Sequence, residues 1–412
     1  MAEPVDVDVR MKGFRRRMEV ARAQELVLQH CARLPAEPVP LRRAHGRVLA
    51  RDVIAEHPVP PFRRAAMDGY AVRAEETFGA SQYNPVFFDL VGEALPGRAF
   101  EEVLQPAQAV RIMTGAPVPE GADAVVMAEY AREQGRQVAV YAPVPPQKHV
   151  SEAGEDVRAG QCVLRAGRRL RPQDVGVLSA LGQDHVEVVR RPKVRLVITG
   201  DELLPAGSKP SGYRIVDANS VILEGLVCRD GGEPLMAGII PDDRDQIAAA
   251  LSDPEADVVL VSGGTSVGRE DHAPLIVAER GTLLVHGIAM RPSSPTGFGV
   301  IGSTLVFLLP GNPVSCLAAY ELLAGPAVRI LGGLSAELPH RRVRAPLRRK
   351  ISSVLGRLDY VRVQLDAGGV VPLATSGASI LSSAVLADGF VLVPPNSEGW
   401  APGTEVEVYL YD

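Results

Sequence analysis

Three loops of the chain contain glycines and hydroxyl-bearing side chains of the kind that bind phosphates and other oxyanions. They read ITGDELL, VSGGTSVGREDH and LLPGNPVSC, and each follows an apolar run. Glycine lets the backbone approach a ligand and aim its amide groups at an anion, while Ser, Thr and Asn side chains add hydrogen bonds. The loops therefore predict an oxyanion or phosphate pocket, whose candidate ligand-binding residues are Thr199, Gly200, Gly263, Gly264, Ser266, Pro310, Gly311, Asn312 and Pro313.

Acidic residues accompany these loops. Glu202 lies in the first loop, Asp242 follows the apolar run LMAGII, and Asp271 ends the second loop. Carboxylates clustered beside an anion site usually require a hard divalent cation, typically Mg²⁺, to offset their charge. We therefore expect these residues to be catalytic and to bind Mg²⁺. Each loop also has a purely structural interpretation, and Asp271 in particular could cap the helix that begins near Pro274.

A further candidate is Arg291 in HGIAMRPSSPTGFG, where Pro292 and Pro295 stiffen the segment. Its planar, permanently charged guanidinium group is suited to an oxyanion, although a surface arginine is the simpler interpretation. The histidines have no metal-ligand spacing, and no GxSxG nucleophile motif occurs. A covalent intermediate is therefore not expected.

The loops must be positioned by a regular scaffold, and the sequence predicts one from Lys193 onward. KVRLVITG, EPLMAGII, ADVVLVSGG and STLVFLL have the composition of buried strands, and they alternate with helical segments, one of which we expect Asn219 to cap. Such alternation predicts a parallel, doubly wound sheet. Ligands of open α/β sheets bind beyond the carboxyl ends of the strands, so these loops should converge there.

The rest of the chain predicts further units. Phe14 to Gln29 has the periodicity of a short amphipathic helix, with Phe14, Met18, Ala21 and Leu28 on one face, and a second helix is expected over 172–181. Short alternating runs over 67–150, and again after residue 334, predict β domains. We expect an N-terminal linker domain (13–50 and 150–184), a β-rich domain (51–149), an α/β domain (185–335) and a C-terminal β domain (336–412).

Composition excludes several classes of protein. The chain has 49 acidic and 44 basic residues, and its formal charge of −5 gives no basic field for nucleic acid or an anionic membrane. Its four cysteines lie far apart, which disfavours a zinc site or a disulfide scaffold. The first residues have no apolar stretch of signal-peptide type. We expect a cytoplasmic protein.

Taken together and in order, several strings resemble the molybdopterin molybdenumtransferase family, which comprises the MoeA proteins and gephyrin E domains. They are PPFRRAAMDGYAV, RIMTGAPVPEGADAVV, AGEDVRAG, TGDEL, DANS, SGGTSVGREDH, MRPSSPTGFG and PGNPVS. The resemblance implies an elongated homodimer with an α/β domain like that of the molybdopterin adenylyltransferase and a C-terminal β barrel. It also implies insertion of molybdate, the substrate, into adenylylated molybdopterin, giving molybdenum cofactor and AMP with Mg²⁺ or a similar cation. The adenylyltransferase and apo-molybdoenzymes would be partners.

The resemblance also implies functional residues elsewhere in the chain. Asp68 in MDGY, Thr114 in MTG and Asp156 in GED would reach the cleft from the β-rich domain of a partner subunit, with the two aspartates catalytic. Turn-forming roles explain these residues equally well on sequence grounds alone. Arg362 and Ser383 match family positions that border the same cleft and bind substrate.

Two departures from the family pattern concern the oxyanion site. The family usually reads KPGKP where this chain has Arg291 to Pro295, so Ser294 replaces a lysine, and Ala65 replaces the serine before MDGY. Loss of a positive charge should weaken binding of a dianion. The alternatives are therefore a divergent pterin-binding or scaffold protein with weakened catalysis, or a molybdopterin adenylyltransferase.

Overall fold

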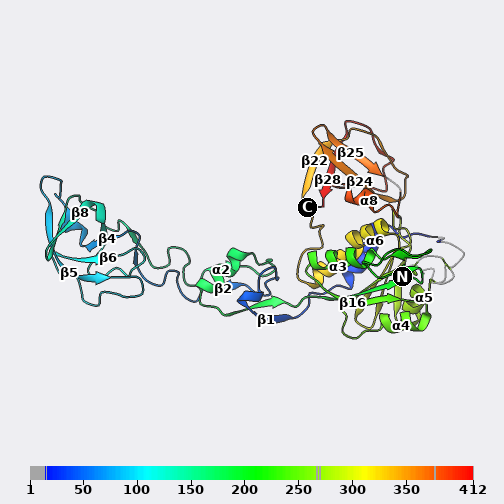
Figure 1. Ribbon diagram of the computed structural model, residues 1–412, viewed down its shortest axis with the longest axis horizontal. Helices are drawn as coiled ribbons and strands as arrows, with labels where there is room; N and C mark the ends of the chain where they lie inside the picture. Colours follow the sequence, from blue (N-terminus) through cyan, green and yellow to red (C-terminus); the bar gives the residue numbers. More distant parts are fainter. Residues whose placement is uncertain (1–13, 15, 266–267, 269–270, 375–376, 412) are drawn as a thin grey trace. The chain divides into compact units, whose positions relative to one another are not determined.

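The computed structural model describes residues 14, 16–265, 268, 271–374 and 377–411. The chain divides into two compact units, one formed by residues 39–45 and 51–186 and the other by 1–38, 46–50 and 187–412. It passes between them within β1 (Ala36–Pro40) and β12 (His185–Val189), and twice more near residues 45 and 50. Figure 1 shows the elements coloured along the sequence. The four predicted domain boundaries stay a prediction.

The first of these units is rich in β structure. Its six-stranded sheet has the order β7-β4-β6-β5-β9-β8, and its small pairs are β3 with β10 and β2 with β11. Hydrophobic residues from the large sheet, among them Val72, Phe88 and Val138, form its core. The unit contains β2 (Val53–Ile54), β3 (Arg64–Ala65), β4 (Gly69–Val72), β5 (Val86–Ala94), β6 (Gln108–Ile112), β7 (Ala124–Met127), β8 (Ala131–Gln134), β9 (Gln137–Val140), β10 (Val150–Ser151), β11 (Cys162–Leu164), α2 (Pro172–Ala180) and the 3₁₀ turns Leu41–Arg43, Ala74–Thr77 and Ala128–Tyr130.

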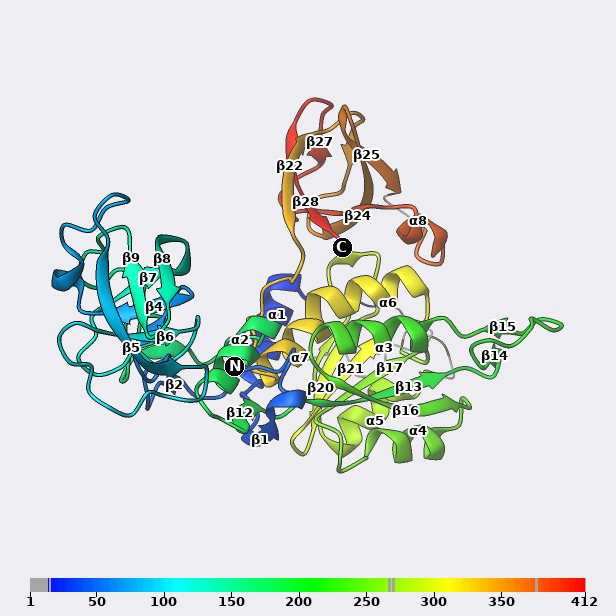
Figure 2. The same cartoon turned by 60° about the vertical axis from the view of Figure 1, so that its left-hand side comes forward.

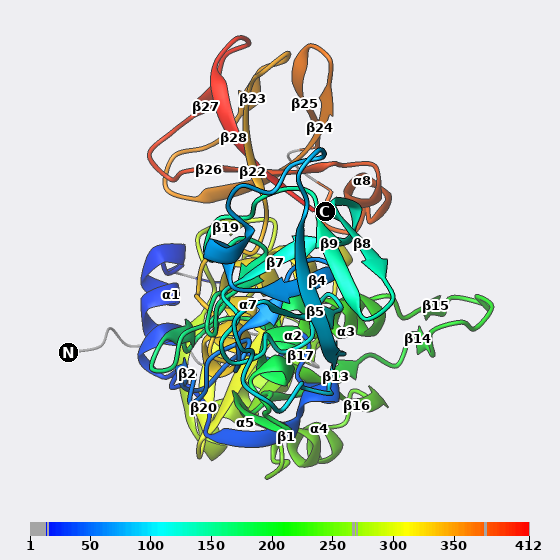
Figure 3. The same cartoon turned by 90° about the vertical axis from the view of Figure 1, so that its left-hand side faces the viewer.

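The other unit is built on a sheet of order β16-β13-β17-β21-β20-β18. Its elements are β13 (Lys193–Thr199), α3 (Asn219–Arg229), β16 (Glu233–Ile240), α4 (Arg244–Leu251), β17 (Val258–Ser262), α5 (Ala273–Arg280), β18 (Thr282–His286), β20 (Gly297–Ile301), β21 (Thr304–Leu309), α6 (Pro313–Ala319) and α7 (Gly325–Leu331). The short strands β14 (Leu203–Leu204) and β15 (Ile215–Val216) form an arm that extends from the sheet (Figures 2 and 3).

Alternation along the central strands explains the layers. Val194, Leu196 and Ile198 of β13 pack with α3, α6 and α7 on one face, whereas Val197 packs with α4 and α5 on the other. Because successive side chains of a strand point to opposite faces, a strand covered on both sides is apolar throughout. Figure 2 shows the two helical layers on either side of the sheet.

The four predicted strands are parallel, as expected, but the sheet also contains two antiparallel strands that were not predicted. β16, β13, β17 and β21 are parallel, but β20 is antiparallel to both β21 and β18. The proline-containing segment around Arg291 connects β18 to β20 in place of a helix. The sequence therefore shows no strand–helix alternation at these two strands. The sheet is therefore mixed, with its parallel part on the strands that precede the predicted loops.

The N-terminal helix also differs from expectation. α1 (Val20–Gln29) begins later than Phe14, and its buried residues are Val20, Ala23 and Val27. Leu28 of the predicted apolar face is exposed. The helix thus buries a neighbouring row of side chains, which packs against the core at residues 320–331.

The C-terminal part forms a sheet of order β19-β24-β26-β28-β22, with β25 paired to β24, and a separate pair of β23 with β27. Its elements are β19 (Met290–Arg291), β22 (Arg342–Pro346), β23 (Ile351–Ser352), β24 (Leu358–Asp366), β25 (Gly369–Ala374), α8 (Ser382–Val385), β26 (Gly389–Val393), β27 (Gly399–Trp400) and β28 (Glu405–Leu410). β19 comes from the α/β part of the chain and pairs in parallel with β24, so that Arg291 lies opposite Asp359.

Among the described residues, one helical segment, Pro313–Leu331, is long and apolar enough to cross a membrane by length and composition, and 89% of its apolar window is buried. It runs through α6, a π-helical turn (Tyr320–Ala324) and α7. The segment is therefore the central core helix of this unit.

Candidate active site

The predicted loops meet in a cavity of about 830 Å³ at the carboxyl edge of the parallel strands. Strand register explains the convergence, because Ser262 at the end of β17 is paired both with Ile198 of β13 and with Leu309 of β21. The predicted residues that line the cavity are Thr199, Gly200, Glu202, Asp242, Gly263, Gly264, Asp271, Pro295, Pro310, Gly311, Asn312 and Pro313. Ser266 lies outside the described residues.

The glycines of the second loop are required by close backbone approach. Gly263 has φ +98°, and a Cβ there would lie 2.3 Å from the carbonyl oxygen of Thr199. Any other residue would force β13 and β17 apart at the edge that lines the cavity. Beyond the glycines, the Thr265 hydroxyl donates to the carbonyl of Leu309 at 3.0 Å and fixes the loop to β21.

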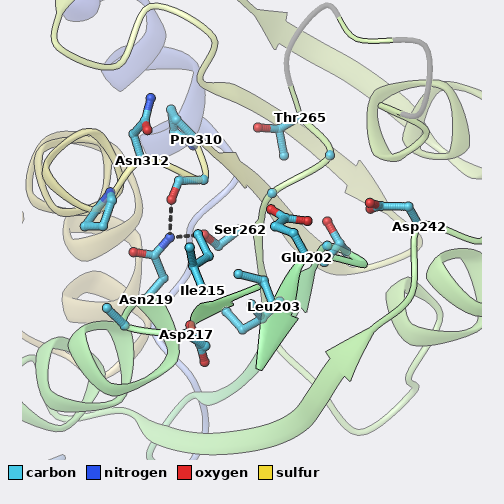
Figure 4. A pocket seen from close by; sticks show the side chains of 18 of the residues that line it. Glu202, Leu203, Ile215, Asp217, Asn219, Asp242, Ser262, Thr265, Pro310 and Asn312 are labelled. Atoms are coloured by element: carbon cyan, nitrogen blue, oxygen red, sulfur yellow. Dashed lines mark hydrogen bonds between the residues drawn. The ribbon is translucent and has the colours of Figure 1, made fainter. Parts of the chain in front are cut away.

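Asn219 has a different role from the predicted helix cap. The carboxylate of Asp217 caps α3, accepting a hydrogen bond from the Ser220 amide at 3.1 Å. The Asn219 side-chain amide instead donates to the Ser262 hydroxyl at 2.8 Å and to the Gly311 carbonyl at 2.7 Å (Figure 4). It therefore ties α3 to the loops after β17 and β21. The string DANS has two capping-type residues at the start of one helix, and Asp217 is the one that caps it.

Two buried oxygen atoms in the cavity wall have no hydrogen-bond partner among the described residues. They are Thr199 Oγ1 and Asn219 Oδ1. Buried polar atoms are nearly always paired, because leaving one unpaired costs about 1–3 kcal/mol. Both atoms can accept hydrogen bonds, so the wall is prepared for a ligand that offers N–H or O–H donors.

Carboxylates form the opposite wall. Figure 4 shows Glu202 and Asp242 on one side of the pocket, with Asn219, Pro310 and Asn312 on the other. The carboxylate of Asp271 accepts a hydrogen bond from the Gly268 amide at 2.5 Å, which holds the second loop. Within the described part of the chain, no three His, Cys, Asp or Glu side chains lie close enough to hold a metal ion by themselves. Magnesium commonly takes one or two carboxylates plus water and phosphate oxygens, and this donor set fits that pattern.

Four predicted residues lie elsewhere. Arg291 and Pro292 line a second cavity of about 650 Å³, together with Arg17 and Arg357. Arg362 is fully buried in β24, where burial lowers its pKa, and Ser383 donates to the carbonyl of Ile380 at 2.6 Å. Neither of these two lines either cavity, although the neighbouring Ser379 lines the first.

The β-rich unit holds the remaining predicted residues. The Asp68 carboxylate accepts hydrogen bonds from both the amide and the hydroxyl of Thr114, each at 2.7 Å. These bonds, the amide bond first, lower the pKa of Asp68 because they stabilise its ionised form. Asp156 is exposed. Asp68 and Thr114 thus form one hydrogen-bonded pair. Their motifs are separate in the sequence and did not predict this contact.

Three regions of the chain are similar to known protein families. Residues 18–182 match the MoeA N-terminal region (domains I and II), 195–330 a probable molybdopterin binding domain, and 344–411 the MoeA C-terminal region (domain IV). The chain belongs to the MoeA family of molybdopterin molybdenumtransferases. The predicted membership, and with it a role as an enzyme of molybdenum cofactor biosynthesis, is confirmed.

Relatives of the MoeA family align along nearly the whole chain. A molybdopterin biosynthesis protein of Methanocaldococcus jannaschii is 35% identical over 97% of this chain and 100% of its own length. Molybdopterin molybdenumtransferase 2 of Mycobacterium tuberculosis is 37% identical, over 90% of this chain and 94% of its own. A crystal structure of the MoeA protein from Pyrococcus horikoshii has a TM-score of 0.83 at 36% identity, covering 96% of this chain and all of that one.

Proposed function

We propose that this member of the MoeA family inserts molybdate into adenylylated molybdopterin, releasing molybdenum cofactor and AMP. The observation that carries the proposal is the cavity at the carboxyl edge of β13, β17 and β21, with glycine loops on one side and carboxylates on the other. Its volume of about 830 Å³ lies within the usual range for small-molecule sites. A pterin joined to a nucleotide supplies both anionic phosphates for the loops and N–H donors for the open acceptors.

The glycine loops bind the phosphates in this proposal. Gly263 and Gly264 adopt backbone conformations that only glycine takes readily, and they precede Thr265, whose hydroxyl anchors them. Backbone amides in such loops donate to phosphate oxygens without the cost of ordering a long side chain. Thr199 Oγ1 and Asn219 Oδ1, the unpaired acceptors, would receive donors of the heterocycle.

The carboxylates act on the water that cleaves the adenylyl group. Water adds to phosphorus as the bond to the departing phosphate oxygen breaks, and a base must take the proton of the water. Glu202 and Asp242 lie together on the wall where this proton would be received. Mg²⁺ would supply charge neutralisation, held by carboxylates among Glu202, Asp242 and Asp271 with phosphate oxygens and water completing its shell.

We further propose a cytoplasmic homodimer in which Asp68, Thr114 and Asp156 of one subunit complete the site of the other. The exposed Asp68 carboxylate, held ionised by Thr114, supports a role toward a cation or a polar substrate. Apo-molybdoenzymes would take up the product, and the adenylyltransferase would supply the substrate.

The test is release of AMP from purified adenylylated molybdopterin by the protein with Mg²⁺ and a titration of molybdate. Molybdate-dependent release, followed by activation of an apo-molybdoenzyme, is the expected result. Binding of the pterin without such release would support the scaffold alternative. Formation of pyrophosphate from ATP and molybdopterin would instead identify an adenylyltransferase.

A further inference from the structure

A buried histidine connects the C-terminal β sheet to the helical core of the α/β part. His340 lies in the segment between α7 and β22, and its side chain is 4% exposed. Its Nδ1 atom lies 2.6 Å from the carbonyl oxygen of Leu410 in β28, and its Nε2 atom lies 3.2 Å from a carboxylate oxygen of Glu321. Glu321 belongs to the π-helical turn between α6 and α7, so the imidazole bridges the two parts.

Both ring nitrogens of His340 face acceptors. A carbonyl oxygen can only accept a hydrogen bond, so Nδ1 donates its proton to Leu410. The Nε2 contact with Glu321 is bent, so its attraction comes from charge more than from hydrogen-bond alignment. A neutral imidazole would turn a lone pair toward the negative carboxylate, whereas an imidazolium is attracted to it. The arrangement therefore fits the doubly protonated ring.

The surroundings of the imidazole keep Glu321 ionised. Arg229, at the end of α3, donates to both carboxylate oxygens of Glu321, at 2.6 and 3.0 Å. Burial raises the pKa of Glu321, but its interactions with His340 and Arg229 lower it overall. The second carboxylate of the cluster, Asp230, pairs with Arg229 and Arg329. His340 and Arg229 thus share one buried negative charge.

Aromatic rings enclose the imidazole on the side of the C-terminal sheet. The Phe390 ring lies edge-on to it, with 5.2 Å between ring centroids, and the Tyr411 ring lies at 6.1 Å. The Tyr411 hydroxyl is hydrogen-bonded to that of Tyr360 at 2.8 Å, and burial raises the pKa of Tyr411, so this phenol stays neutral. A proton on His340 therefore acts mainly through its attraction to Glu321.

The helical segment that carries Glu321 touches the C-terminal part at a second point. The amide of Val314, in the first turn of α6, donates to the carbonyl of Ala378 at 3.0 Å. Val314 and Glu321 are about two turns apart, or about 10 Å along the helix axis. Two attachments at this separation fix the orientation of the C-terminal part more closely than either does alone. π-Helical turns such as the one around Glu321 are rare and frequent at functional sites.

We infer that His340 is a positioning residue that, while protonated, holds the loop at 377–381 against the two cavities. Gly377 and Ala378 line the second cavity, and Ser379 lines the first. Without the proton, the attachment of this loop to Val314 and the pairing of β19 with β24 remain, but the attraction to Glu321 is lost. The loop should then open more often. The inference does not depend on which ligands the cavities bind.

The direction of the pH dependence follows from the two charges. Histidine side chains change their charge between about pH 5 and 8. The attraction between His340 and Glu321 requires the proton on His340, so it is present at low pH and is lost as the pH rises and that proton leaves. The loop should therefore be held more firmly at about pH 6 than at about pH 8.5.

The experiment measures hydrogen–deuterium exchange of the peptide 377–386 in the full-length protein by mass spectrometry. The ratio of its exchange rate in His340→Gln to that in the wild type, taken at one pH, cancels the pH dependence of chemical exchange. This ratio should be about tenfold at about pH 6 and close to one at about pH 8.5, because the wild type itself loses the attraction. The matched control is His185→Gln, which removes a histidine from an exposed pair with Asp184 and should leave the ratio close to one at both pH values.

A second measurement needs no substitution at the pair. In the wild type, protection of the same peptide relative to its chemical exchange rate should fall about tenfold between about pH 6 and about pH 8.5. The same fall is expected in His185→Gln, whereas His340→Gln should show none. Circular dichroism checks that each variant is folded.

Three results would overturn the inference. A ratio near one at about pH 6 would show that His340 does not hold the loop. An equal increase at both pH values would show a packing role that does not depend on charge, and an equal effect of His185→Gln would show a non-specific one. None of these measurements uses a substrate, so a failure of AMP release would refute the proposed function and leave this inference standing.

Discussion

Replacement of Asn219 by alanine tests whether this residue holds the first cavity together. Its side chain is 6% exposed and donates two hydrogen bonds, to the Ser262 hydroxyl and the Gly311 carbonyl. Each buried hydrogen bond contributes about 0.5–1.5 kcal/mol net, so Asn219→Ala should lower the free energy of unfolding by about 1–3 kcal/mol. Asn219→Asp should be at least as damaging at neutral pH, because it would turn a carboxylate oxygen toward the Gly311 carbonyl.

Urea denaturation followed by far-ultraviolet circular dichroism measures this change, and hydrogen exchange of the peptide spanning 309–316 locates it. The control is Asn396→Ala, an exposed position whose substitution should change the free energy by less than about 0.5 kcal/mol. If Asn219→Ala were as stable as this control, with unchanged exchange in the loop after β21, Asn219 would not tether the loops. Our account of how the cavity is held would then be refuted.

Three further outcomes are expected. Thr114→Val removes the hydroxyl bond to Asp68 and should raise the pKa of that carboxyl toward its ordinary value, as measured by NMR titration. Asp271→Ala should abolish AMP release while leaving the free energy of unfolding, measured by thermal melting, within about 0.5 kcal/mol of wild type, because this half-buried loop carboxylate lies outside the hydrophobic core. Glu321→Gln should cost about 3–5 kcal/mol, since it removes the buried carboxylate charge that Arg229 and His340 share and leaves Arg229 with Asp230 alone. Burial raises the pKa of Glu321, but hydrogen bonds from His340 and Arg229 outweigh this and lower it overall. The stability contributed by Glu321 is therefore present above its unfolded pKa and is lost as pH falls through the lower folded value, a loss that Glu321→Gln should not show in melting curves at decreasing pH.

The cavity could be foreseen from sequence because strand order fixes where loops meet. Apolar runs such as KVRLVITG identify buried parallel strands, and their carboxyl ends must share one edge. The glycines at 263 and 264 were recognisable for the same reason, since a loop that closes against a neighbouring strand has no room for a side chain. Local sequence therefore carried enough information to name most of the lining of the first cavity.

The mixed sheet could not be foreseen. β18 and β20 have no distinct helix between them, and only pairing with β21 decides that they run antiparallel. Asn219 was expected to be a cap because its local environment resembles one, yet its partners lie 43 and 92 residues away in sequence. Contacts at such separation are chosen by tertiary packing and leave no local pattern.

The sequence by itself determined the family, the strands that carry the binding loops, and the residue types at the edge of the sheet. Those properties follow from side-chain periodicity and from glycines that have no substitute. Only the tertiary structure decided how charge is distributed between the two cavities. Arg291 is an obvious oxyanion ligand in the sequence, but pairing of β19 with β24 places it against buried Asp359. Arg357 contacts the other oxygen of the same carboxylate, because electrostatic partners are set by distance in space and not by distance along the chain.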